Sequence, residues 1–151
     1  MDELSRPLAV PFFFFGTLMD IDVLARVVGR RVRPSEFEPA LLWGQRRHQV
    51  RNAPYPVLRP HRDSHVRGVL FQPRSWDERL RVDHFESGEY EADILRVQAG
   101  TRMVDALCYL DLADVFEVEP QDWSLHHFRA VVKPDYLAQC DAWMADYVAL
   151  T

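Results

Sequence analysis

The segment LAVPFFFFGTLMDIDVLARVVGRR, residues 8–31, joins an apolar run directly to a helical pattern. Residues 8–15 are a short continuous apolar run that ends at Gly16, which is typical of a strand buried on both faces. Apolar residues then recur at helical spacing, and Gly29 is well placed to end that helix; these residues are Ile21, Leu24, Val27 and Val28. The segment therefore predicts a buried strand, a turn at Gly16 and a helix.

The turn at Gly16 has two interpretations. Because glycine has no side chain, backbone N–H groups of such a turn can face a ligand directly. N–H groups near the start of a helix are suited to a carboxylate or a phosphate. In the alternative interpretation, Gly16 only connects the strand to the helix.

Composition limits the class of protein. The chain has 151 residues, 48% of them hydrophobic and 27% charged, which fits one globular domain with a substantial core. The formal net charge of −5 disfavours a nucleic-acid partner, whose phosphates need cationic side chains. Cys108 and Cys140 give neither a disulfide framework nor metal-ligand spacing. The acidic start and the short phenylalanine run predict no signal peptide and no membrane span, so we expect a cytoplasmic protein, monomeric or homodimeric.

The rest of the chain is rich in strand patterns. We expect strands over residues 39–50, 55–60, 65–73, 90–98 and 103–110. Ser75 and Glu78 form a capping-box signature for a helix that Gly88 would end. Residues 134–150 predict a C-terminal helix with one apolar face, formed by Leu137, Cys140, Met144 and Tyr147.

Consecutive strands without intervening helices favour an α+β fold, an antiparallel sheet or small barrel with attached helices. We expect one domain over residues 1–151. Within it, residues 8–117 would form the strand-rich part, and residues 118–151 a C-terminal helical extension.

An acidic segment, RVDHFESGEYEADIL at residues 81–95, contains a candidate general acid/base. Glu86 falls at the C-terminal end of the expected helix, where the helix dipole disfavours a negative charge. Burial beside Phe85 and the charge of Asp83 would also raise the pKa of Glu86, so that it could exchange a proton near neutral pH. The alternative is that these acidic residues form a solvated surface.

Together these segments resemble the gamma-glutamylcyclotransferase-like family, in particular its compact branch that contains gamma-glutamylamine cyclotransferase. The resemblance covers roughly residues 10–112. The family's motifs Tyr-Gly-Ser/Thr-Leu, Tyr-Pro, Gly-x-Leu and Leu-Asp-x-x-Glu-Gly-x-x-Tyr match Phe15–Leu18, Tyr55–Pro56, Gly68–Leu70 and Val82–Tyr90.

This resemblance implies a small mixed β-barrel and an enzyme that cyclises a γ-glutamyl amine or amino acid to 5-oxoproline, releasing the amine. Glu86 would be the general acid/base, and no metal or organic cofactor would be needed. The small-molecule substrate would be bound by Phe15, Gly16, Thr17, Leu18, Tyr55, Pro56 and Tyr90, with backbone N–H groups of the Gly-Thr-Leu loop holding its α-carboxylate and γ-carbonyl.

The sequence departs from the family at Phe15, where tyrosine is usual, at Ser87, where glycine is usual, and at Ala92, where arginine is common. An alternative function is therefore a non-catalytic domain that binds a small metabolite or a protein partner, and a weaker one is an enzyme acting on another amide or ester. The basic residues Arg46, Arg47 and Arg51 form either a solvated cluster or a rim that attracts an anionic substrate.

Overall fold

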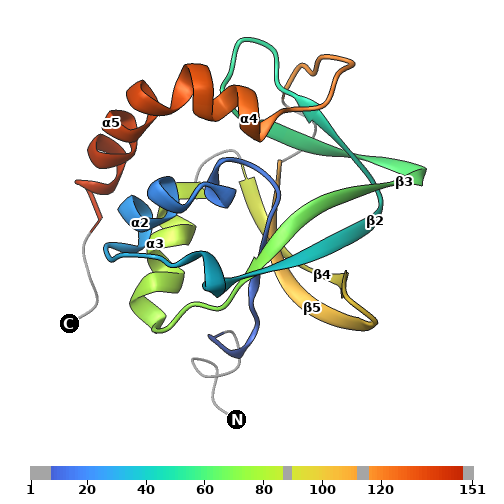
Figure 1. Cartoon of the computed structure of the whole chain (residues 1–151), viewed down its shortest axis with the longest axis horizontal. Coiled ribbons are helices and arrows are strands. Elements are labelled where there is room, and N and C mark those ends of the chain that lie inside the picture. Colours follow the sequence, from blue (N-terminus) through green and yellow to red (C-terminus); the bar gives the residue numbers. More distant parts are fainter. Residues whose placement is uncertain (1–7, 87–89, 112–115, 148–151) are drawn as a thin grey trace.

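The computed structural model describes residues 8–86, 90–111 and 116–147, and these form a closed five-stranded barrel flanked by helices (Figure 1). Around the barrel the strands follow the order β1-β3-β2-β4-β5, and neighbours are antiparallel except for β1 and β5, which are parallel. The predicted α+β fold with a small mixed barrel is confirmed. The strands are β1 (Phe12–Phe14), β2 (Phe37–Gln49), β3 (Pro56–Phe71), β4 (Tyr90–Ala99) and β5 (Arg102–Asp111).

The helices gather on one side of the barrel, and the C-terminal helix α5 runs past α2 and α3 (Figure 1). Short 3-10 helices precede α2 and β2, and a π-helical turn leads into α5. The helical elements are η1 (Thr17–Met19), α2 (Ile21–Val28), η2 (Pro34–Glu36), α3 (Trp76–Glu86), α4 (Leu125–His127), η4 (Phe128–Val132) and α5 (Lys133–Met144).

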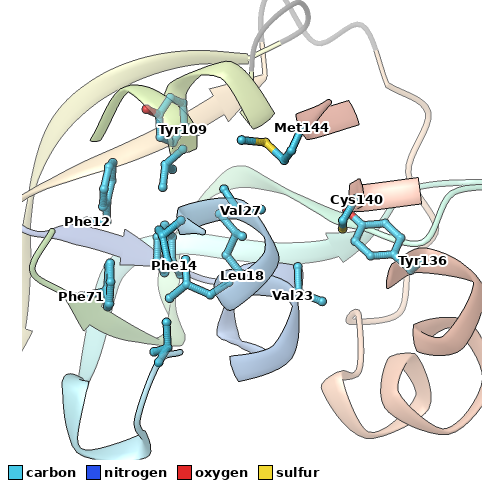
Figure 2. Packing of buried hydrophobic residues seen from close by; sticks show 14 of the residues in the cluster. Phe12, Phe14, Leu18, Val23, Val27, Phe71, Tyr109, Tyr136, Cys140 and Met144 are labelled. Carbon is cyan, nitrogen blue, oxygen red and sulfur yellow. The ribbon is translucent and has the colours of Figure 1, made fainter. Parts of the chain in front are cut away.

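The phenylalanine run is buried on both faces of β1, as predicted. Phe12 and Phe14 pack into the core between the barrel and the helices (Figure 2), whereas Phe13 and Phe15 belong to the second core inside the barrel. Successive side chains of a strand point to opposite faces, so four aromatic residues in a row serve two cores. The strand is shorter than the predicted 8–15, since only Phe12–Phe14 pair as a strand.

Strand β3 replaces the two strands predicted over residues 55–60 and 65–73. It runs without a break because it pairs with β2 along most of its length. Pro60, which suggested a break, lies opposite Gln45, next to a register shift at which residues 61–64 of β3 have no partner in β2. A proline lacks the N–H needed for a regular ladder and is tolerated at such a bulge.

The helix ends follow the local sequence. Asp20 accepts hydrogen bonds from the N–H groups of Asp22 and Val23 at the start of α2, and Gly29 ends this helix with a left-handed φ of 78°. At α3, Ser75 Oγ accepts from the Glu78 N–H at 3.1 Å, which confirms the predicted cap. The predicted stop of α3, Gly88, lies outside the described residues.

Helix α5 folds onto the domain, but its buried face is rotated from the predicted one. Tyr136, Cys140 and Met144 are buried, while Leu137 and Tyr147 are partly buried at the edge of the same core. Figure 2 shows Tyr136, Cys140 and Met144 approaching the core from the C-terminal helix. No helix in the described part of the chain is both long and apolar enough to cross a membrane.

Candidate active site

A pocket of about 420 Å³ lies between the helices and one end of the barrel. Its lining comes from β1 and the loop after it, the start of β3, the end of α3, β4, β5 and the C-terminal segment. Every residue that the sequence predicted for the site lines this pocket, namely Phe15, Gly16, Thr17, Leu18, Tyr55, Pro56, Glu86 and Tyr90. Their individual roles remain predictions.

Gly16 is required by a close approach of the chain. A Cβ at this position would lie 2.9 Å from Cδ of Pro56 and 3.1 Å from its Cγ, closer than a side chain tolerates. Gly16 and Pro56 both line the pocket, so a larger residue at position 16 would displace one of its walls. The glycine is therefore required for this close packing as well as for the turn.

The loop after β1 carries hydrogen-bond donors that the protein does not use. The Met19 N–H donates to the Gly16 carbonyl at 2.9 Å and closes the single turn of η1. The first N–H groups of a helical turn lack partners within it. Among the described residues, none accepts a hydrogen bond from the N–H of Gly16, Thr17 or Leu18.

Glu86 ends α3 and faces this pocket as a half-buried carboxyl group. Burial raises its pKa to about 8, and the negative charge of Asp83 contributes to the rise. Within the described chain the carboxyl group of Glu86 makes no ion pair and no hydrogen bond. It therefore differs from a solvated surface carboxylate, and the pKa rise predicted from its position agrees with that environment.

Asp83 lies one turn before Glu86 and is held by β5. The Tyr109 hydroxyl donates to Asp83 Oδ1 at 3.2 Å, and Tyr109 itself lines the pocket. Burial raises the pKa of Tyr109, with further contributions from Asp83 and Glu86, so its hydroxyl stays protonated at neutral pH. This hydrogen bond fixes one carboxylate near the other and maintains the like charge that Glu86 experiences.

Aromatic rings form another wall of the pocket. The rings of Tyr55 and Tyr90 meet edge to face at 6.3 Å, and both contact Phe116 at 5.7 Å. Burial raises the pKa of Tyr90, and the Glu86 carboxylate adds to this, so Tyr90 is also a neutral hydroxyl. The wall offers apolar surface with hydroxyl groups at its edge.

Sequence reasoning missed three pocket residues from the C-terminal segment, Tyr136, Trp143 and Asp146. The Tyr136 hydroxyl lies 3.2 Å from Thr17 Oγ1, and its ring packs against Trp143 at 5.6 Å. The available signal was Tyr136 itself, a large amphipathic residue one position before the predicted apolar face of the tail helix. The extension thus contributes to the pocket as well as covering the core.

Two other expectations from the sequence need correction. None of Arg46, Arg47 and Arg51 lines the pocket, so of the two interpretations of this cluster the one that made it a cationic rim is wrong. Arg51 pairs with Glu117 and Glu119, and Arg47 contacts Asp122. Ala92 is exposed on β4 and also lies outside the lining, so this departure from the family leaves the pocket wall unchanged.

The described residues contain no group of three or more His, Cys, Asp or Glu side chains arranged to hold a metal ion. The histidine pair of β3 has other contacts: His61 Nδ1 lies 2.7 Å from Ser64 Oγ, and the His65 ring packs on Trp43.

Comparison with known proteins gives a family and a fold. The family described as gamma-glutamyl cyclotransferase, AIG2-like, matches residues 12–125. A protein of Arabidopsis thaliana solved in solution is 21% identical with a TM-score of 0.62, covering 86% of this chain and 78% of that one. A gamma-glutamyl cyclotransferase is 16% identical with a TM-score of 0.56, covering 88% and 86% of the two chains.

An uncharacterised Homo sapiens protein is 16% identical with a TM-score of 0.60, covering 94% of this chain and 92% of that one. At these identities the solved structures show that the fold is shared. Among curated proteins, none matches this sequence significantly.

Proposed function

The chain belongs to the gamma-glutamyl cyclotransferase, AIG2-like family, and from this premise we propose that it cyclises a γ-glutamyl amine or amino acid to 5-oxoproline. The reaction is an intramolecular aminolysis in which the substrate supplies its own nucleophile. Positioning the two reacting groups can then supply much of the rate acceleration.

The proposed mechanism uses one carboxyl group and the loop after β1. Glu86 removes a proton from the α-amine of the substrate, and the amine nitrogen attacks the γ-carbonyl carbon. The bond between that carbon and the leaving nitrogen breaks, and Glu86 returns the proton to the departing amine. The unused N–H groups of Gly16, Thr17 and Leu18 hold the α-carboxylate and the oxyanion that forms on the carbonyl oxygen.

One observation carries the proposal: an unpaired carboxyl with a pKa of about 8 shares a pocket with free backbone donors. A general acid/base works best when its pKa lies near the working pH, because it must both accept and return a proton. A binding domain would have no need of an unpaired half-buried carboxyl, which burial makes costly to ionise.

The charge of the pocket supports one class of leaving group over another. No lysine or arginine is found among the described residues that line it, whereas Asp146 and the ring of Trp143 are. A leaving group with its own carboxylate would meet no lysine or arginine there and would be repelled by Asp146. We therefore expect neutral or cationic leaving amines to be preferred over free amino acids.

The test is release of 5-oxoproline from a panel of γ-glutamyl compounds by wild type and Glu86→Gln. The panel contains an alkylamine, an ε-linked lysine, an amino acid and glutathione. We expect release by wild type and a loss of about 10²–10⁴-fold in Glu86→Gln, because glutamine keeps the shape but cannot take the proton. No release from any compound by folded wild type would instead favour the non-catalytic binding function.

A further inference from the structure

We propose that Arg47 is a positioning residue: its guanidinium holds the carbonyl of Phe15 so that the next N–H, that of Gly16, is presented to the substrate. The inference rests on the proposed function of the pocket. It assigns a role to an arginine that lies outside the pocket and never touches the substrate.

All three guanidinium nitrogens of Arg47 donate hydrogen bonds. Its Nη1 donates to the Phe15 carbonyl at 2.9 Å and to the Arg67 carbonyl at 3.2 Å. Its Nε and Nη2 donate to the two oxygens of Asp122, at 2.7 and 3.1 Å, as a bidentate pair. The group also lies over the Trp123 ring, 5.6 Å from its centroid. With its side chain only 15% exposed, Arg47 is held in one position.

Because the peptide bond is planar, the hydrogen bond from Arg47 to the Phe15 carbonyl also fixes the direction of the Gly16 N–H. No described peptide bond is cis, and in a planar trans peptide the carbonyl and the following N–H point in opposite directions. Since the Phe15 carbonyl points to Arg47, the Gly16 N–H must point away from it. Gly16 lines the pocket and Arg47 does not, so we infer that the N–H faces the pocket.

The positive charge also strengthens the donor. A hydrogen bond from a charged donor is stronger than one between neutral groups, and it polarises the peptide that accepts it. Among the described residues, only Arg47 donates a hydrogen bond to the Phe15 carbonyl. Without Arg47 the Phe15–Gly16 peptide would lose this hydrogen bond, directly before the loop that would hold the substrate.

Asp122 and Trp123 connect Arg47 to the C-terminal part of the chain. Trp123 is 3% exposed, and its Nε1 donates to the Pro54 carbonyl at 2.8 Å, next to the pocket residues Tyr55 and Pro56. The same arginine therefore links the loop after β1, the strand β2 and the segment that leads into α4. This arrangement explains why Arg47 is fixed rather than free at the surface.

The sequence permits a direct measurement. Of the six glycines, only Gly16 follows a phenylalanine, so labelling phenylalanine carbonyls with ¹³C and glycine with ¹⁵N isolates one peptide, Phe15–Gly16, in an HNCO spectrum. The carbonyl shift reports the hydrogen bond from Arg47. The amide shift, followed while 5-oxoproline is added, reports contact with the ligand.

The variants are Arg47→Met, Arg47→Lys and, as a matched control, Arg46→Met, whose arginine is exposed and reaches only the Pro120 carbonyl at 3.4 Å. In Arg47→Met we expect the carbonyl signal to move and the response of the Gly16 amide to 5-oxoproline to weaken at least about tenfold. We also expect kcat to fall by up to about 10²-fold, the lower end of the loss of about 10²–10³-fold that removal of an oxyanion donor causes. Arg47→Lys should recover part of each effect, and Arg46→Met should behave like wild type.

Two results would overturn the proposal. The first is an Arg47→Met protein with a displaced carbonyl signal but wild-type kcat and a wild-type amide response. The second is an Arg46→Met protein with losses as large as those of Arg47→Met, which would indicate a general effect of charge. If Arg47→Met does not fold, Arg47→Lys and Asp122→Asn decide by the same two signals. Wild type that binds 5-oxoproline without turning over any γ-glutamyl compound would refute the proposed function, and the carbonyl and amide signals would still test the orientation of the Phe15–Gly16 peptide.

Discussion

At the scale of a single residue, the environment of Glu86 predicts the pH dependence of the reaction. The general base must be ionised to accept the first proton, so kcat/KM should rise with pH and level off above an apparent pKa of about 8. A pH series of 5-oxoproline release measures this directly. Asp83→Asn should move the midpoint to lower pH, because it removes the like charge that disfavours ionisation of Glu86.

The same pKa has a consequence for stability that does not depend on catalysis. The folded pKa of about 8 exceeds the ordinary glutamate pKa of 4.5, so the folded protein holds the proton over that interval whereas the unfolded chain releases it. The contribution of Glu86 to stability therefore falls as pH rises from about 4.5 to 8. Urea unfolding of Glu86→Gln should show this part of the pH dependence removed, at about 1.4 kcal/mol for each unit of raised pKa. If the free energies of unfolding of wild type and Glu86→Gln changed in the same way with pH, this would contradict the raised pKa of Glu86.

At the scale of elements, Gly68 shows how tightly β1 is enclosed by the barrel. A Cβ at this position would lie 2.3 Å from the Phe14 carbonyl oxygen and 2.6 Å from the Phe13 ring. Neither can retreat, because the backbone of β1 pairs with β3 on one side and β5 on the other. We expect Gly68→Ala to lower the free energy of unfolding by about 1–3 kcal/mol, as overpacking does, measured by urea denaturation. Gly100→Ala is not a suitable control, because its φ of 64° introduces strain of its own.

The sequence predicted these elements well where the pattern was local. The helix α2, the cap at Ser75 and strands β2, β4 and β5 follow from spacing and turn residues that act within a few positions. Strand β3 was divided in two because Pro60 is a local stop signal. The two predicted parts do pair separately with β2, and residues 61–64 between them have no partner in β2, but the strand continues through them. Pairing between distant segments is not encoded in either segment alone.

The same distinction between local patterns and distant contacts applies to the residues of the candidate site. Motif positions such as Gly16 and Glu86 were identified from short segments, and they line one pocket. Tyr136 and Arg47 were missed or assigned another role because their partners, Thr17 and Phe15, are more than thirty positions away. A side chain that acts through a distant backbone group leaves no periodic pattern in the sequence.

At the scale of the whole molecule, an ionic cluster around the buried Asp20 joins the substrate loop to the C-terminal extension. Asp20, which is 1% exposed, caps α2 directly after η1 and accepts from Arg129 Nε at 2.9 Å. Lys133 Nζ lies 3.1 Å from Asp20 and 2.7 Å from Asp22. Burial would raise the pKa of Asp20, but the hydrogen bonds from Arg129, the Val23 N–H and Lys133 outweigh it and lower the pKa.

This cluster predicts how acid affects the extension. Because the folded pKa of Asp20 lies below its unfolded value, its contribution to stability is complete above the unfolded value and is lost as pH falls through the folded one. Asp20→Asn should therefore cost about 1–3 kcal/mol at pH 7 in urea unfolding and progressively less toward pH 3, since removing one partner leaves the others unpaired. Asp22→Asn is the matched control, because its exposed carboxylate shares only Lys133 and should cost less than about 1 kcal/mol. Equal losses in the two variants would mean that burial of Asp20 between the loop and the extension adds nothing, and that the two ends of the pocket are held together by apolar packing alone.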